Sequence, residues 1–390
     1  MAVPDAIAPV APVISGPCAL AGLRDHLVGL DFDRIVLISD EGIAEAGLVE
    51  RVIHEAIGGR HVEVFLAPPG EPHTVCVDAA ADRVRATPHP LVIGLGGGSA
   101  LDVAKLAAAA AACGGPVGPR LLGAYDWPGR SSTVAIPTTA GTGSEATRTC
   151  VVSDDAGRKL WAWGEALLPA LVVLAPELTL GLPAHLTAAT GVDAFVHAVE
   201  AASSRRVTAT ARAAALDAVT RIAAGLPRVA REPGDLEARL SLQEAARLAG
   251  VAIDAAGTGP AHAVGHALGS LYGIPHGVAV GVGLRATLDF SLAAGPEPFA
   301  ELTRCLDPNA KPDSLPGRVA SLYAEAGFDA AAARWAETDV DPEALAACMQ
   351  GEENLPMAHN GPRSPVGADW ERLARSARAV LRGEAPAEGS

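Results

Sequence analysis

The stretch Pro90–Cys113, PLVIGLGGGSALDVAKLAAAAAAC, decides the fold. It opens with an apolar run typical of a buried strand, passes through three glycines and a serine, and continues as an alanine-rich helix. A strand, a tight turn and a helix in this order form the first half of a βαβ unit. We therefore expect a parallel sheet with helices on its faces. The turn Gly96–Ser99 should lie at the carboxyl edge of that sheet.

The flanking segments repeat the same alternation of strand and helix. Three apolar, β-branched runs are predicted strands: RIVLISD (Arg34–Asp40), HVEVFLA (His61–Ala67) and TVAIPTT (Thr133–Thr139). Between the first two, Glu45–Ile57 has helical periodicity. This order predicts a doubly wound parallel sheet.

The pattern changes near Leu180, where the chain becomes rich in alanine and loses its β-branched runs. We predict an α/β fold with two domains: a Rossmann-like parallel-sheet domain over residues 1–180, and an all-helical domain over residues 181–390. The length of 390 residues agrees with two domains.

The composition argues against several classes of protein. Hydrophobic residues make up 49% and charged residues 19% of the chain, which favours a packed core over disorder. The net charge of −15 argues against binding to nucleic acid or to anionic lipid. The longest small-apolar run, Leu106–Cys113, is too short to span a bilayer, and the N-terminus lacks the basic region of a secretory signal. Six scattered cysteines without a CxxC pair indicate a reducing compartment, so we expect a cytoplasmic protein.

Two loops are candidates for binding phosphate or ribose. In Gly96–Ser99, glycines let backbone N–H groups turn toward an anion, and Ser99 is the expected N-cap of the next helix. The second loop, Thr138–Glu145, is rich in hydroxyls and glycines and follows the next strand. Asp40, at the end of the first strand, could accept a hydrogen bond from an adenosine ribose. Each feature also has a simpler interpretation as a turn, and position alone does not decide.

Five residues of the helical region form a candidate metal site. Asp193 and His197 are four residues apart, as are His262 and His266, so each pair would share a helix face; His276 follows in a Gly-Pro loop. Imidazole and carboxylate ligands suit Fe(II) or Zn(II). The alternative is that these are hydrogen-bonded or core residues. The spacing alone leaves open which of the histidines would bind a metal.

Taken in order, the motifs resemble those of the iron-containing (group III) alcohol dehydrogenases. The resemblance rests on GGGSALDVAK (Gly96–Lys105), AIPTTAGTGSEAT (Ala135–Thr147), APELTLGLP (Ala175–Pro183), ATGVDAFVHAVEA (Ala189–Ala201) and HAVGHALGSLYGIPHG (His262–Gly277). It implies an N-terminal dinucleotide-binding domain and a C-terminal helical metal domain, with cofactor and substrate in the cleft between them. It further implies a homodimer.

The resemblance also implies a role for each matching residue. The metal ligands would be Asp193, His197, His262 and His276, and His266 would be the catalytic proton relay beside the nicotinamide. Asp40 matches the position that favours NAD over NADP, without excluding NADP. The other cofactor-binding residues would be Gly96, Gly97, Gly98, Ser99, Asp102, Thr138, Thr139, Thr142 and Lys159.

The function implied by the resemblance is that of an NAD(H)-dependent alcohol dehydrogenase or aldehyde reductase with Fe(II) or Zn(II). The metal would polarise the substrate oxygen while hydride passes to or from the nicotinamide. One alternative is a metal-independent enzyme like maleylacetate reductase. Another is an NAD- and metal-dependent lyase like dehydroquinate synthase, but the basic residues that its phosphorylated substrate needs are missing between Gly250 and Leu284. A third is a non-catalytic nucleotide-binding protein.

Overall fold

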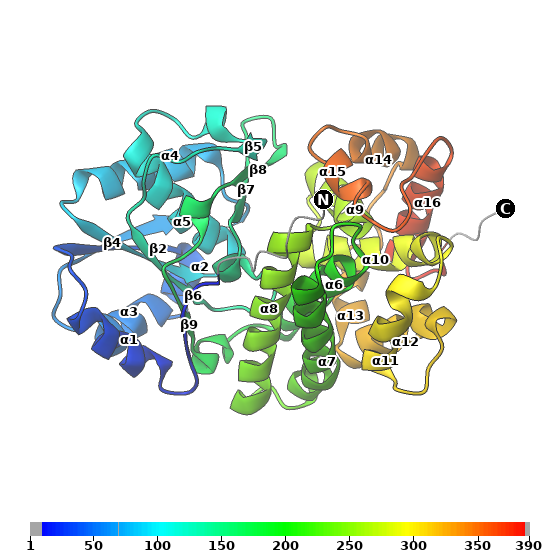
Figure 1. Cartoon of the computed structure of the whole chain (residues 1–390), viewed down its shortest axis with the longest axis horizontal. Coiled ribbons are helices and arrows are strands. Elements are labelled where there is room, and N and C mark those ends of the chain that lie inside the picture. The colour runs from blue at the N-terminus through cyan, green and yellow to red at the C-terminus, as the bar shows by residue number, and fades with distance from the viewer. Residues whose placement is uncertain (1–9, 69, 387–390) are drawn as a thin grey trace. The chain divides into compact units, whose positions relative to one another are not determined.

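The computed structural model of the chain describes residues 10–68 and 70–386. Two compact units make up the chain, one over Pro9–Leu182 and one that contains Pro183–Ser390. Helices and strands of both units are labelled in Figure 1. The outer ends of the two predicted domains, residues 1–9 and 387–390, lie outside the described residues.

The first unit is built on a parallel sheet of six strands in the order β1-β9-β6-β4-β2-β3. Every strand pair in this sheet is parallel, as the sequence predicts. The strands are β1 (Val13–Ser15), β2 (Arg34–Asp40), β3 (Val62–Ala67), β4 (Pro90–Gly96), β6 (Ser132–Pro137) and β9 (Leu171–Leu174).

Helices cover both faces of this sheet. The side chains of β2 alternate between two separate cores: Val36 and Ile38 belong to one, and Ile35 and Leu37 to the other. The first core is completed by α4 (Thr74–Ala86) and α5 (Gly98–Cys113), and the second by α1 (Ala19–Val28) and α3 (Leu48–Val52). Residues 100–110 of α5 are all buried, so its alanine run lets the helix pack closely on the sheet.

Two features of this unit differ from the prediction. The expected helix over Glu45–Ile57 is broken: α2 (Glu41–Glu45) ends before Gly47, which adopts a positive φ of 73°, and α3 runs into a π-helix over Ile53–Ile57. A second sheet, in the order β5-β8-β7, was not predicted. Its strands are β5 (Gly123–Ala124), β7 (Thr149–Ser153) and β8 (Lys159–Trp163).

The start of α5 also corrects the sequence analysis. The N-cap of α5 is Gly97, and Ser99 lies within the first turn. The carbonyl of Gly97 already accepts a hydrogen bond from the Leu101 N–H at 3.1 Å, so the helical pattern begins before Ser99. The prediction of Ser99 as N-cap is therefore wrong, and this helix end has no side-chain cap.

The second unit is helical throughout its described part, as predicted. Its longest helices are α6 (Ala184–Ser203), α7 (Ala209–Arg231), α8 (Leu236–Ala256), α9 (Pro260–Tyr272) and α10 (His276–Leu292). Shorter helices follow: α11 (Ala300–Leu306), α12 (Leu315–Glu325), α13 (Phe328–Ala333), α14 (Pro342–Met349), α15 (Leu355–Ala358) and α16 (Asp369–Leu381). None of the helices in the described part has the length and apolarity that crossing a membrane requires.

Candidate metal centre and nucleotide loops

Three helices of the second unit carry the candidate metal ligands. Asp193 and His197 lie one turn apart on α6, and His262 lies near the start of α9. His276 is the first residue of α10. Asp193, His197 and His262 are buried, and His276 is partly exposed.

Glycines bring these helices into close contact. A Cβ on Gly277 would collide with the carbonyl oxygen of Ala189 on α6, and one on Gly283 would collide with that of Ala261 on α9. Backbone therefore packs against backbone where α10 meets its two neighbours. A side chain at either position would push α10, and with it His276, away from the other ligands.

The four side chains converge on one carboxylate oxygen. The distance from Asp193 Oδ1 is 3.7 Å to His197 Nε2, 3.9 Å to His262 Nε2 and 3.6 Å to His276 Nε2. One ligand atom from each of the four residues can be chosen so that all lie within 4.8 Å of one another.

This spacing fits a bound metal better than hydrogen bonding between the same atoms. The three distances exceed hydrogen-bond reach. Ligands that bind one ion at about 2.0–2.2 Å in a tetrahedral arrangement lie about 3.4 Å apart. Nitrogen and oxygen donors without thiolate suit Fe(II) or Zn(II). The donor set therefore fits a divalent metal of the kind that the sequence implies.

His266 lies beside this cluster but outside the group of four. It is one turn after His262 on α9 and is 9% exposed. Its ring centroid is 5.4 Å from that of His276 and 6.1 Å from that of His262. Spacing in the sequence left the choice among the histidines open, and the geometry separates His266 from the other three.

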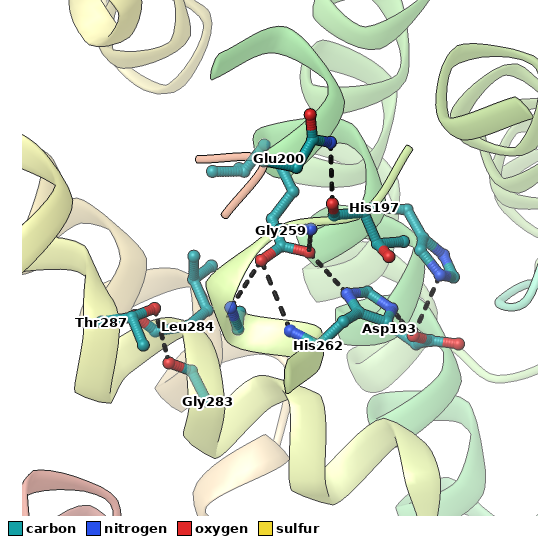
Figure 2. Close-up of polar contacts among 12 residues, drawn as sticks. Asp193, His197, Glu200, Gly259, His262, Gly283, Leu284 and Thr287 are labelled. Atoms are coloured by element: carbon teal, nitrogen blue, oxygen red, sulfur yellow. Dashed lines mark hydrogen bonds and ion pairs between the residues drawn. The ribbon is translucent and has the colours of Figure 1, made fainter. Parts of the chain in front are cut away.

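Glu200 contacts the candidate site, although the sequence does not single it out. It lies on α6 and contacts the His262 ring, with 2.5 Å between Glu200 Oε2 and His262 Nδ1. In Figure 2 the His262 ring lies between the carboxylates of Glu200 and Asp193. A signal was present in the sequence, because Asp193, His197 and Glu200 follow at the i, i+4, i+7 spacing of one helix face.

The two predicted nucleotide loops lie against each other in the first unit. A Cβ on Gly98 would come within 2.6 Å of Thr142, and one on Gly97 within 3.6 Å of Thr139. The N–H of Thr138 donates to the Gly96 carbonyl at 2.9 Å. The Thr138 hydroxyl is buried and has no hydrogen-bond partner among the described residues. A buried hydroxyl with no partner is costly, which marks this position for a ligand.

Asp40 and Lys159 each have a partner within the first unit. Asp40 Oδ1 accepts from the Ile43 N–H at 3.0 Å and so caps α2. Its Oδ2 points toward the glycine loop, 3.3 Å from where a Cβ on Gly96 would be. Lys159 Nζ lies 2.9 Å from Oε1 of Glu71, which is half exposed. A cofactor contact by Lys159 would therefore have to share or replace this ion pair.

Asp102 belongs to a buried network at the base of the second loop. Its Oδ1 accepts from the Ser144 hydroxyl at 2.5 Å and its Oδ2 from the Val151 N–H at 2.8 Å. Lys105 Nζ lies 3.7 Å from Oδ1. Burial raises the pKa of Asp102, while the Lys105 charge and these hydrogen bonds oppose the rise. In this structure the Asp102 carboxylate holds the loop in place.

Comparison with known proteins identifies the family. The pattern of the family described as "Iron-containing alcohol dehydrogenase" matches residues 11–176. That of the "Fe-containing alcohol dehydrogenase family, C-terminal" matches residues 187–365. Together they span both units.

Individual relatives agree. The probable alcohol dehydrogenase EutG of Salmonella typhimurium is 31% identical over 359 residues, which cover 91% of this chain and 90% of that protein. The 4-hydroxybutyrate dehydrogenase of Cupriavidus necator is 36% identical over 231 residues, or 58% of this chain and less than two thirds (60%) of that protein.

A solved structure extends the likeness to the whole fold. The sulfoacetaldehyde reductase of Bifidobacterium kashiwanohense, crystallised in complex with NAD+, is 25% identical with a TM-score of 0.85. The match covers 96% of this chain and 98% of that one. The matches do not favour the metal-independent reductase or the lyase. The chain belongs to the iron-containing alcohol dehydrogenases, a family of oxidoreductases that act on alcohols with NAD and iron, and its buried Asp/His cluster fits the metal.

Proposed function

We propose that the chain interconverts a small alcohol and its aldehyde, with NAD(H) as the hydride carrier and a divalent metal held by Asp193, His197, His262 and His276. The observation that carries this proposal is the convergence of three imidazole Nε2 atoms on Asp193 Oδ1 at 3.6–3.9 Å. In this assignment residues 1–180 form the dinucleotide-binding domain and residues 181–390 the metal domain.

The metal, when bound, supplies Lewis-acid polarisation of the substrate oxygen. The protein's contribution is a rigid donor set, since three of the four ligands are buried on packed helices. His266 is assigned the proton transfer: its imidazole takes up the proton that the alcohol releases on oxidation and returns it when the aldehyde is reduced. Its ring lies beside that of His276 and outside the group of four, which supports a role next to the metal site.

The cofactor assignment rests on the two loops of the first unit. The uncapped start of α5, with Gly96, Gly97, Gly98 and Ser99, is suited to a diphosphate. Thr138, Thr139 and Thr142 surround the glycines, and the unpartnered Thr138 hydroxyl supports a ligand contact there. Further contacts are assigned to Asp40, Asp102 and Lys159. The NAD+ bound in the related sulfoacetaldehyde reductase supports NAD, and NADP remains an alternative.

We assign Fe(II) as the native metal, with Zn(II) as the alternative, because the donor set suits both and the family is named for iron. Candidate substrates are suggested by the names of two relatives, a 4-hydroxybutyrate dehydrogenase and a sulfoacetaldehyde reductase. An assay panel should therefore include these two compounds beside simple alcohols and aldehydes.

We further propose a homodimer located in the cytoplasm. The dimer follows from the family resemblance, and the location from the six cysteines, all of which are free thiols in the structure. Light scattering on the purified protein should give twice the mass of the chain. Fractionation of cells should recover the protein with the cytoplasmic enzymes.

The deciding experiment compares metal-free and reloaded protein. The chain is purified without oxygen, stripped with a chelator, and reloaded with Fe(II) or Zn(II). NADH formation or consumption is then followed across the panel. We expect one bound metal per chain and turnover only in a reloaded form. Equal turnover without metal would refute the metal site and favour a metal-independent reductase.

A further inference from the structure

We propose that Glu200 is a positioning residue that fixes the His262 ring so that its Nε2 faces the metal. The inference rests on the proposed metal site and assigns a role to a residue outside the ligand set. Glu200 lies on α6, the helix that also carries Asp193 and His197, and it contacts His262 on α9.

The Glu200 carboxylate is held in one orientation by the start of α9. Its Oε2 accepts from the Gly259 N–H at 2.8 Å. Its Oε1 accepts from the N–H groups of Ala261 at 2.6 Å and His262 at 3.4 Å. The side chain is 5% exposed, so little water competes for these bonds. The carboxylate is thus a fixed point and not a mobile side chain.

Glu200 substitutes for a cap that α9 lacks. The N-cap of α9 is Gly259, which has no side chain to offer, and Pro260 follows at the first helical position. A Cβ on Gly259 would come within 2.9 Å of Glu200 Oε1, so the glycine makes room for the carboxylate. An acidic group at a helix start is favoured by the free N–H groups and the helix dipole. The interaction with the start of α9 explains why the Glu200 carboxylate is fixed. It does not by itself require the contact between Glu200 and the His262 ring.

The contact with the ring determines which nitrogen carries the proton. His262 Nδ1 lies 2.5 Å from Glu200 Oε2, which already accepts from the Gly259 N–H. A carboxylate oxygen accepts hydrogen bonds, so the proton must be on Nδ1. In a neutral imidazole the lone pair is then on Nε2.

Nε2 is also the atom that faces the cluster. It lies 3.9 Å from Asp193 Oδ1 and has no hydrogen-bond partner among the described residues. Figure 2 shows the ring bridging the two carboxylates, with one nitrogen toward each. Outer carboxylates that hold a metal-binding histidine in this way set its tautomer and strengthen its binding.

The test is the variant Glu200→Gln in the full-length protein. Glutamine has nearly the same shape, but only one of its two terminal atoms accepts. If its amide nitrogen faces the ring, it donates to Nδ1 and forces the proton onto Nε2, which then cannot bind a metal. If it faces the start of α9, it opposes the N–H groups there.

A matched control separates this role from a general effect on α6. Ser203 lies on the same helix and lines the same small cavity as Glu200. Its hydroxyl donates to the Val199 carbonyl at 2.8 Å, within the helix. Ser203→Ala therefore changes the same region without touching the His262 ring.

Two readouts are needed. The first is the affinity for Zn(II), measured on metal-free protein against a competing chelator. We expect Glu200→Gln to bind about 10–100-fold more weakly than the parent, and Ser203→Ala to bind as the parent does. The second is the 15N NMR spectrum of the histidine rings in metal-free protein, with His262 assigned by its absence in His262→Gln. We expect the proton on Nδ1 in the parent, and in Glu200→Gln a shift of the tautomer balance toward Nε2, because neither orientation of the amide offers the ring a charged acceptor.

The outcomes separate this inference from the proposed function. Parent protein that does not bind Zn(II) or Fe(II) would refute the metal site and the role of Glu200 with it. Parent protein that binds the metal, with Glu200→Gln equal to it in affinity and tautomer, would refute only the role of Glu200. If Glu200→Gln does not fold, the parent alone decides, because a proton on Nε2 of His262 would contradict the inference directly.

Discussion

Asp102 in the first unit and Asp193 in the second are both buried, yet their surroundings differ. Asp102 accepts hydrogen bonds at both oxygens and has the Lys105 ammonium 3.7 Å away, so its charge is compensated within the chain. Around Asp193 Oδ1 are three imidazole nitrogens at 3.6–3.9 Å, beyond hydrogen-bond reach. The first arrangement is a hydrogen-bonded ion pair, and the second has the spacing expected of ligands around a cation.

The difference separates a carboxylate that holds a loop in place from one that is proposed to bind a metal. Burying a charge raises the free energy of the folded state unless an oppositely charged or hydrogen-bonding partner offsets the loss of hydration. We expect Asp102 to matter for stability, and Asp193, as a proposed metal ligand, to matter for metal binding and turnover. The two sites can therefore be perturbed separately.

The largest effect is expected for Asp193→Asn. The amide keeps the shape but loses the charge that attracts a divalent ion. Lewis-acid polarisation lowers the activation barrier by several kcal/mol, so we expect turnover to fall by about 10³-fold or more when it is lost. Metal content and NADH-linked rates check this. Asp217→Asn, on the exposed face of α7, is the control and should match the parent. Full metal occupancy in Asp193→Asn would contradict the assignment.

Lys105→Met should have the next largest effect, and on stability instead of binding. Lys105 Nζ donates to the carbonyls of Ser144 at 2.7 Å and Thr149 at 2.8 Å, and the residue is 1% exposed. Methionine would leave these acceptors and the Asp102 charge without their cation. We expect a loss of about 3 kcal/mol in the free energy of unfolding, measured in urea with the metal bound. Lys311→Met, at an exposed lysine, is the comparison. Loss of the metal from Lys105→Met would contradict the independence of the two sites.

Gly98→Ala should weaken the nucleotide loop alone. The new Cβ would lie 2.6 Å from Thr142 and would push the two loops apart. Overpacking of this kind costs about 1–3 kcal/mol, which corresponds to about 10-fold or more in affinity for NADH if the loops bind it. Titration of NADH fluorescence measures this change. A Cβ on Gly118 meets nothing within 4 Å, so Gly118→Ala should bind NADH as the parent does. Unchanged affinity in Gly98→Ala would exclude the loop from the cofactor site.

The smallest effect concerns Glu177, a carboxylate for which burial outweighs a backbone hydrogen bond and the charge of Arg51. Its Oε2 is buried without a hydrogen-bond partner among the described residues, and burial raises its pKa above the ordinary 4.5. A raised pKa in the folded state favours folding at low pH, and this contribution is lost as the pH rises through the folded-state value. Glu177→Gln should therefore be slightly more stable than the parent at neutral pH. This difference in stability between Glu177→Gln and the parent should disappear below pH 4.5. Urea unfolding of both proteins from neutral pH to below pH 4.5 would test it.

The sequence predicted the parts of the fold that depend on local pattern. The strand over Arg34–Asp40 is found with the predicted bounds, because an apolar, β-branched run is a strand signal that can be read from the local sequence. The second sheet was not predicted: β7 and β8 are short strands that are defined by pairing with each other, and β5, only two residues long, exists through its pairing with β8. The N-cap was misplaced because a serine after glycines resembles a cap whether or not the helix has already begun.

The candidate site could be predicted as a set of residues but not as an arrangement. Spacing grouped Asp193 with His197, and His262 with His266, yet it did not separate His266 from the candidate ligands. That separation depends on how closely α10 approaches α6 and α9, which the contacts at Gly277 and Gly283 determine. Glu200 was missed because its partner, His262, is distant in the chain.

The four candidate ligands span the chain from residue 193 to residue 276 and lie on three separate helices. An ion bound to all of them would close a long loop, and so would act in the unfolding of this unit much as a disulfide does. Unlike a disulfide, this cross-link opens when the ion leaves, and its strength follows the free metal concentration. The supply of metal would then set how long the helical unit survives heat or proteolysis, quite apart from whether the enzyme turns over.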